Sequence, residues 1–323
     1  MSPDRPVITE PGSLRSFITS TEDHFVLAAL GIPRLDADTW VLEVTGSVDR
    51  ELALSYSDLR ALPSRASAVT LECAGDPLDL DRPLRRVSTA RWRGVSLADV
   101  LELAGARSSA SHVWLDGADH GVYRSGSPVA ELVTEYRKDL PLAVSPDVLL
   151  AYEMNGHTLP PEHGFPVRVI VPGHYGTNSV KWLRRITVAN GRPQGLFCSV
   201  LYHHQDRVDG IVVRRPIREV AVNSVITEPE PGVTLPLGQH RVAGWVWGCR
   251  EVIGVDVGVG ASWHAARLEP MRDRAWQRFE STVTLTRPGE HRILACARDR
   301  HGQQPMDEHI NQVASVTVRV KVP

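Results

Sequence analysis

Apolar and polar residues alternate along much of this 323-residue chain, which is the pattern of strands with one buried face. The first forty residues lack that alternation, so we expect them to form an irregular arm. The first clear alternation is TWVLEVTGSV at residues 39–48, which predicts a half-buried strand. Further strands are predicted at AVTLEC, DVLLAYEM, VRVIVPG and KWLRRITVAN.

Two short segments between these strands have helical signals. Ser57 is placed to cap a helix that ends at Leu62. The segment SLADVLELAG begins with a capping-box-like spacing of Ser96 and Asp99 and stops at Gly105. Its apolar residues share one helical face, namely Leu97, Val100, Leu101 and Ala104. Short helices among strands predict a mixed α+β region.

From about Ile217 the chain changes to short strand patterns separated by turn residues, which predicts a β-sandwich. The seven segments are VITEPE, HRVAGWVWG, EVIGVDVGVG, SWHAARLE, RFESTVTL, HRILACARD and ASVTVRVKV. The prolines and charges of RRPIREVAVNSVITEPEPG suit a linker between domains. We therefore expect two domains, residues 1–216 and residues 217–323.

Composition and charge exclude several classes of protein. Hydrophobic residues at 42% and charged residues at 23% are ordinary for a globular protein, and a net charge of -2 provides no basic surface for nucleic acid. The N-terminal residues lack the basic start and apolar run of a secretory signal, and no segment approaches transmembrane length. We expect a cytoplasmic protein that binds neither nucleic acid nor a membrane.

The four cysteines are far apart and include no C-x-x-C pair, which argues against a zinc ribbon or a thioredoxin-like site. Cys249, Trp263 and Cys296 follow the Cys, Trp, Cys order of immunoglobulin domains, in which a disulfide joins the two sheets. In a reducing cytoplasm we expect thiols instead.

Some residues in the first half are suited to chemistry. Cys73 ends an apolar strand and precedes Gly75, which allows a sharp turn, so its thiol is either presented into a cleft or an inert buried side chain. His163, Arg168 and Lys181 lie among apolar strands and Gly-Pro loops, where they either hold a phosphate or remain solvated charges. The loop at residues 173–179 can also turn backbone N–H groups towards an anion.

Five motifs occur in one order along the chain and together resemble the sulfite oxidase family of molybdopterin-dependent oxidoreductases. They are ECAG, STARWRGVSLADVL, LLAYEMNG, PPEHGFPVRVIVPG and SVKWL. In the second half, AGWVWG, the paired Trp263 and Trp276, and PGEHRILACARDRHGQQP resemble the immunoglobulin-like dimerisation domain of that family. The resemblance implies an α+β molybdopterin-binding domain, an all-β immunoglobulin-like sandwich, and a homodimer formed through that sandwich.

The resemblance also implies roles for individual residues. Cys73 of the CAG motif corresponds to the protein ligand of molybdenum, and a soft thiolate suits a metal that is already held by sulfur. Tyr152 of AYEMNG and Trp92 of ARW match residues that line the substrate pocket. The residues implied to contact the molybdopterin are Asp119, His163, Arg168, Ser179, Val180 and Lys181.

Two pairs of adjacent residues that include histidine are further candidates for the functional site. His174 and Tyr175 replace small or apolar residues of the family near the expected metal pocket, where they either perform acid/base work or fill space. His203 and His204 either bind a metal or lie in a solvent-exposed loop.

The implied reaction is oxygen atom transfer with a small-molecule substrate, and a separate electron acceptor is expected because no haem-binding domain accompanies the chain. Two stretches depart from the family. Leu27, Ala28 and Ala29 stand where it usually has Arg-Asn-His, and Asp76, Pro77 and Leu78 stand where it has Asn and arginine. These losses weaken an anion pocket, so sulfite is not the expected substrate.

Two alternatives follow from the same departures. One is a scaffold that has lost the molybdenum cofactor and performs non-redox acid/base catalysis, such as isomerisation or cyclisation, with His174, Tyr175, Tyr152 or Asp76 as acid/base groups. The other is a binding protein in which the pocket motifs serve folding alone.

Overall fold

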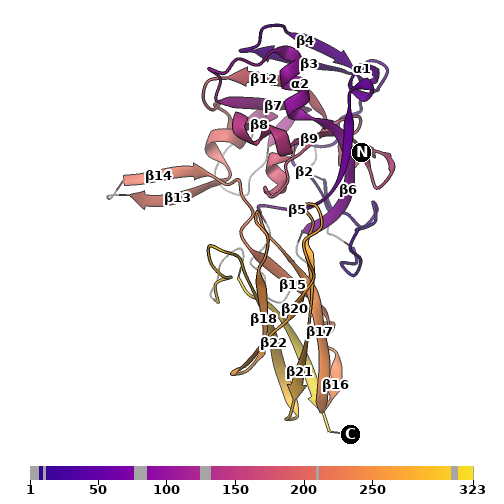
Figure 1. Cartoon of the computed structure of the whole chain (residues 1–323), viewed down its shortest axis with the longest axis vertical. Helices are drawn as coiled ribbons and strands as arrows, with labels where there is room; N and C mark the ends of the chain where they lie inside the picture. Colours follow the sequence, from indigo (N-terminus) through magenta and orange to yellow (C-terminus); the bar gives the residue numbers. More distant parts are fainter. Residues whose placement is uncertain are drawn as a thin grey trace. The chain divides into compact units, whose positions relative to one another are not determined.

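The structure is a computed structural model that describes residues 7–9, 12–75, 86–123, 132–208, 211–306 and 312–322. These residues form two compact units (Figure 1). The first contains residues 7–9, 25–67, 91–123 and 132–208 and continues to Arg218. The second contains most of the remainder, from Glu219 onwards, together with residues 12–24, 68–75 and 86–90. Each unit has its own hydrophobic core.

The first unit is built on a five-stranded sheet with the order β4-β3-β12-β7-β8, in which only β3 and β12 are parallel. Leu42 and Val44 of β3 are buried and their neighbours are not, as the alternating pattern predicts. The strands are β3 (Val41–Gly46), β4 (Leu52–Ser55), β7 (His112–Tyr123), β8 (Leu132–Pro141) and β12 (Leu183–Ala189).

A second sheet has the order β10-β9-β6-β5, and β11 also pairs with β9. The chain leaves the first unit along β5 and returns along β6. Because β9 has partners on both sides, its almost unbroken apolar run is buried. The strands are β5 (Ser64–Glu72), β6 (Val87–Ser96), β9 (Leu149–Met154), β10 (His157–Thr158) and β11 (Arg168–Ile170).

Two strand pairs complete the first unit. The predicted irregular arm contains β1 (Val7–Thr9) and β2 (Val26–Ala28), which pair with each other. β13 (His203–Val208) and β14 (Ile211–Pro216) form a hairpin. His203 and His204 therefore lie on a strand, and the prediction that they occupy a loop is wrong.

Strands predominate in both units, and the helical part of the predicted α+β domain is small. α1 (Tyr56–Ala61) is capped by Ser55, whose hydroxyl accepts from the Asp58 amide, so the prediction that Ser57 is the cap is wrong. The predicted capping bond at Ser96 is also missing, although α2 (Leu97–Ala104) buries its predicted face and ends at Gly105 in the left-handed conformation. Short helical turns occur at η1 (Leu142–Asp147), η2 (Pro161–His163), η3 (Gly176–Asn178) and η4 (Leu196–Val200). Within the described residues, no helix is long and apolar enough to cross a membrane.

The predicted β-sandwich is present in the second unit, where two sheets enclose one apolar core. The orders are β15-β17-β21-β20 and β16-β23-β22-β18-β19. Residues 262–269, which were expected to be one strand, divide between the two sheets. The strands are β15 (Asn223–Glu228), β16 (Thr234–Pro236), β17 (Gly238–Trp247), β18 (Gly254–Val259), β19 (Ser262–Ala265), β20 (Arg267–Leu268), β21 (Gln277–Leu285), β22 (Gly289–Arg298) and β23 (Ala314–Lys321).

Tryptophan and cysteine side chains of the sandwich differ in their surroundings. Trp276 stacks on Trp245 with ring centroids 4.9 Å apart, whereas Trp263 is 37% exposed. Cys296 is buried and its thiol donates to the carbonyl of Gln304, and Cys249 is half-buried. The described residues include all four cysteines of the chain, and no disulfide forms among them.

Candidate functional site

Arg168, the first residue of β11, has a buried guanidinium that no carboxylate in the described part of the chain neutralises. The residue is 5% exposed. Nη1 donates to the carbonyl of His163 at 3.0 Å and Nη2 to the carbonyl of Ser179 at 3.3 Å, while Nε has no partner among the described residues. Burial lowers the pKa of Arg168 to about 9. A buried cation with unused donor capacity favours an anionic ligand.

Lys181 and Asp119 belong to the same cluster. Nζ of Lys181 donates to the carbonyl of Glu162 at 2.9 Å, and burial, aided by the charge of Arg168, lowers the pKa of Lys181 to about 7. Asp119 on β7 is 4% exposed, and burial raises its pKa to about 7 although Lys181 opposes the shift. Oδ1 of Asp119 has no hydrogen-bond partner in the described structure. The cluster therefore offers an unused acceptor as well as donors.

A bulge in β7 determines where Asp119 points. The pairing of β7 with β8 changes register between Asp116 and His120. Bulges change the direction of side chains, and this one lies beside a glycine. A Cβ atom on Gly117 would lie 2.3 Å from Oδ1 of Asp119 and 3.0 Å from the carbonyl oxygen of Lys181. The absence of a side chain at Gly117 leaves room for the carboxylate of Asp119.

Two aromatic residues adjoin the cationic part of the cluster. The ring of Trp92, which is fully buried on β6, lies 4.8 Å from the guanidinium carbon of Arg168. Tyr136 on β8 donates to the carbonyl of Thr177 at 2.8 Å, and burial raises its pKa, with Tyr202 and Asp119 adding to the shift. Tyr136 was not predicted as a site residue, because no motif marks it.

Three other predicted residues support Arg168 or its strand largely through their backbones. The carbonyls of His163 and Ser179 accept from the guanidinium, as described above. The hydroxyl of Ser179 accepts from the amide of Val171 at 3.0 Å. The carbonyl of Val180 accepts from the amide of Val169 at 2.7 Å. These bonds fix β11 against the loop that leads to Lys181.

The remaining candidates of the first unit have other neighbours. His174 is buried with Nδ1 3.2 Å from the carbonyl oxygen of Pro172, and the amide of Tyr175 donates to the carbonyl of Arg218. The ring of Tyr152 is buried beside Tyr56, with the guanidinium of Arg60 5.5 Å from its centroid. The described contacts thus connect Tyr152 to α1.

Cys73 follows β5 and belongs to the second unit. Its amide donates to the carbonyl of Arg86 at 2.9 Å. Its half-buried sulfur accepts from the amide of Gly75 at 3.4 Å, and Nη1 of Arg86 is 4.0 Å away. Donors directed at sulfur stabilise a thiolate, which is the form that binds metals.

The stretch at residues 27–29 reaches an apolar cluster through Ala29. Ala28 is buried on β2, and Ala29 packs against a cluster that contains Leu30 and Phe197. Tyr136 packs against the same cluster. The other departures, Asp76, Pro77 and Leu78, lie outside the described residues.

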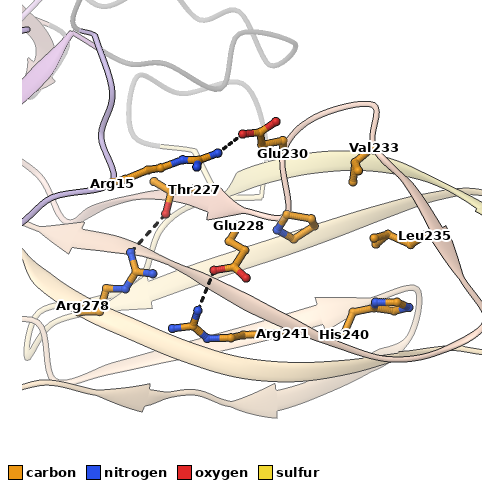
Figure 2. Close-up of a pocket in the computed structure, with 10 residues that line it drawn as sticks. Arg15, Thr227, Glu228, Glu230, Val233, Leu235, His240, Arg241 and Arg278 are labelled. Carbon is orange, nitrogen blue, oxygen red and sulfur yellow. Dashed lines mark hydrogen bonds and ion pairs between the residues drawn. The ribbon is translucent and has the colours of Figure 1, made fainter.

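A pocket of about 600 Å³ lies in the second unit, and Figure 2 shows its charged lining. Arg241 donates to Glu228 at 2.8 Å, and Arg15 pairs with Glu230. These ion pairs balance most of the charge, and the pocket lining contains none of the predicted site residues. Within the described residues, no group of three or more His, Cys, Asp or Glu side chains is arranged to hold a metal ion.

Comparison with known proteins identifies the family. The family described as "Oxidoreductase molybdopterin binding domain" matches residues 29–197. Sulfite oxidase of Gallus gallus is 37% identical over 312 residues, which are 88% of this chain and 67% of that protein. The chain belongs to the sulfite oxidase family of molybdopterin-dependent oxidoreductases. Mitochondrial sulfite oxidase of Rattus norvegicus is 36% identical over 93% of this chain but only 60% of its own length.

The chain is also similar to a nitrate reductase and to one solved structure at lower identity. A nitrate reductase [NADH] of Brassica napus is 33% identical over 78% of this chain and 31% of its own length. The sulfane dehydrogenase SoxCD from Paracoccus pantotrophus has the same fold, with a TM-score of 0.81 and 23% identity over 96% of this chain and 85% of that chain. The chain spans 67% of the length of the Gallus gallus sulfite oxidase and 60% of that of the Rattus norvegicus protein.

The buried cluster fits the cofactor of this family. A phosphate would receive the unused Nε donor of Arg168 and the charge of Lys181, and a pterin N–H group would suit the unused oxygen of Asp119. The missing side chain at Gly117 leaves the carboxylate of Asp119 in the position from which it would make that contact.

Proposed function

We propose that this protein is a molybdopterin-dependent oxidoreductase that catalyses oxygen atom transfer on a small-molecule substrate other than sulfite. The observation that carries the proposal is the buried guanidinium of Arg168, which lacks a carboxylate partner and has an unused Nε donor within the described residues. Burying such a cation costs several kcal/mol unless an anion compensates it, so a core alone gives no reason to keep it.

Under this proposal each residue has a defined task. Arg168 and Lys181 bind the phosphate, Asp119 orients the pterin through a hydrogen bond, and Trp92 holds the plane of the guanidinium. Cys73 supplies the thiolate ligand. The bound cofactor would supply the redox centre that exchanges an oxygen atom and two electrons with the substrate.

The expected substrate is larger or less anionic than sulfite. Ala28 is buried and Ala29 packs against an apolar cluster, and neither side chain offers a charge to an oxyanion. Loss of a cation from a buried oxyanion site costs about 2 to 5 kcal/mol of binding per contact. Tyr152 is proposed to line the substrate pocket, and His174 and Tyr175 are proposed to act as acid/base groups.

The second unit is proposed to be an immunoglobulin-like domain that joins two copies of the chain. Its two sheets and their shared core support that assignment. A separate electron acceptor and a cytoplasmic location are further parts of the proposal.

The test is the molybdenum content per chain, together with fluorescence of released oxidised pterin, in protein expressed where the cofactor is made. We expect near-stoichiometric molybdenum in the unaltered chain and its loss in Cys73→Ser. Cys249→Ser, which alters a half-buried thiol of the sandwich, is the matched control and should retain the metal. A metal-free, pterin-free protein with full catalytic activity would instead support the cofactor-free acid/base alternative.

A further inference from the structure

The residue before Cys73 is a buried carboxylate held by the sandwich. Glu72 is 1% exposed. Its Oε1 accepts from Nδ2 of Asn223 at 2.7 Å and its Oε2 accepts from Nε1 of Trp247 at 2.9 Å. A buried carboxylate is expensive unless donors satisfy both oxygens, and here one donor comes from β15 and the other from β17.

The orientation of Asn223 is itself determined by a second layer of bonds. Its Oδ1 accepts from Nε2 of Gln304 at 3.1 Å and from the amide of Ser224 at 3.0 Å. Oε1 of Gln304 in turn accepts from the hydroxyl of Ser224 and from the amide of Ala297. The amide of Asn223 therefore cannot turn over without breaking bonds in the core of the sandwich.

The second half of the strand that carries Glu72 is attached to the same unit at further points. The Ala68 amide donates to the carboxylate of Asp273, and the Thr70 hydroxyl accepts from the amide of Trp276 at 2.8 Å. Residues 68–72 are therefore held by the sandwich, and Glu72 is the last attachment before the chain turns at Cys73.

We propose that Glu72 is a positioning residue, which Asn223 and Trp247 hold so that the sulfur of Cys73 is fixed for metal binding. This inference rests on the proposed function in so far as Cys73 is the molybdenum ligand. It gives the C-terminal domain a part in cofactor binding in addition to joining two copies of the chain.

The donor and acceptor chemistry of Glu72 allows a sharp substitution. In Glu72→Gln the side chain keeps its shape, but its new NH2 group meets either the indole N–H of Trp247 or the NH2 of Asn223. The indole N–H of Trp247 is only ever a donor, and Asn223 cannot turn its side-chain oxygen towards position 72 without breaking its own bonds. The strand end should loosen, and the thiol of Cys73 should become more accessible.

A second substitution should restore the geometry. In Glu72→Gln combined with Asn223→Asp, the new NH2 group at position 72 donates to the carboxylate at position 223, which still accepts from Gln304 and Ser224. The amide oxygen at position 72 still accepts from Trp247. The total charge of the two side chains is unchanged, and each hydrogen bond among positions 72, 223 and 247 again joins a donor to an acceptor.

The experiment measures the alkylation rate of Cys73 by peptide mass spectrometry, in the full chain expressed without molybdopterin synthesis. We expect Glu72→Gln to raise this rate about tenfold, and the double variant to return it to within about twofold of the original. The control is Val318→Ala, a cavity in the sandwich core that lowers stability without touching Glu72.

The outcomes separate positioning from general destabilisation. The inference is overturned if Glu72→Gln leaves the alkylation rate of Cys73 unchanged. It is also overturned if Val318→Ala, with a similar loss of melting temperature, raises that rate as much as Glu72→Gln does. Molybdenum content is measured in parallel on chains expressed with the cofactor. Absence of metal from the unaltered chain would refute the proposed function, while the alkylation rates would still decide whether Glu72 positions Cys73.

Discussion

The guanidinium carbon of Arg168 lies 4.8 Å from the centre of the Trp92 ring, and both residues are buried. The ring holds the guanidinium plane while two backbone carbonyls accept from its two terminal nitrogens. Nε has no hydrogen-bond partner among the residues that the structure describes. This contact joins strands β6 and β11, and it leaves the cation in the orientation that the proposed phosphate contact requires.

Arg168→Lys should lose the cofactor while the chain still folds. An ammonium group is a single point of charge, so it cannot stack on Trp92, reach both carbonyls and contact a phosphate together. We expect at least about tenfold weaker retention of the cofactor, measured as molybdenum and pterin that remain after dialysis. Arg185→Lys, which alters an exposed pair with Glu43, is the control and should retain both. Equal retention in the two variants would show that Arg168 does not bind the cofactor.

Lys181 should make the cofactor-free protein more stable as pH rises above 7. Its pKa is about 7 in the folded chain and about 10.4 when unfolded, so the unfolded state binds more protons between these values. The penalty for charging the buried amine is fully present below pH 7 and disappears towards pH 10. The Lys181→Met variant should lack this rise in urea-unfolding curves recorded at several pH values.

Asp119 should make the free energy of unfolding fall as pH rises from about 4 to about 7. Its folded pKa of about 7 exceeds the unfolded value of about 3.9, so the folded state binds more protons between them. Its contribution to stability is present below pH 4 and is lost as pH rises through 7. Asp119→Asn should flatten the unfolding free energy in this range and leave the slope above pH 7 intact. An unchanged acid slope would mean that Asp119 is solvated.

Gly117→Ala should displace the carboxylate of Asp119. The added methyl group would lie 2.3 Å from Oδ1, so the carboxylate or the β7 bulge must move. We expect a loss of about 1 to 3 kcal/mol in the free energy of unfolding and a reduced cofactor content. Gly302→Ala adds a methyl group where no atom lies within 4 Å, and it should change stability by less than about 0.5 kcal/mol.

Ser55→Ala should destabilise the chain more than Ser57→Ala. The hydroxyl of Ser55 accepts from the amide of Asp58 at 3.1 Å, and the Asp58 carboxylate accepts from the amide of Ser55. Removing an N-cap of this kind costs about 1 kcal/mol. Ser57 lies inside the first turn, so its loss should cost less than about 0.5 kcal/mol in chemical unfolding. Equal losses would contradict the assigned cap.

Local patterns in the sequence were sufficient to predict much of the secondary structure. Alternation predicted β3 and the strands of the sandwich because burial of one sheet face repeats every second residue. The apolar face of α2 and its stop at Gly105 were predicted for a similar local reason. The motifs also predicted the family, which the comparisons confirm.

The tertiary structure alone decided which of these residues meet. Asp119 and Lys181 lie near each other because β7 pairs with β12, and each charge shifts the pKa of the other. The charge of Arg168, which lies on β11 of the other sheet, also lowers the pKa of Lys181. Tyr136 adjoins them without any motif because its position depends on β8. Hydrophobic periodicity depends on neighbouring residues in the sequence, so the sequence alone reveals it. The attachment of Glu72 to Asn223 and Trp247 depends on packing between distant segments, so only the tertiary structure reveals it.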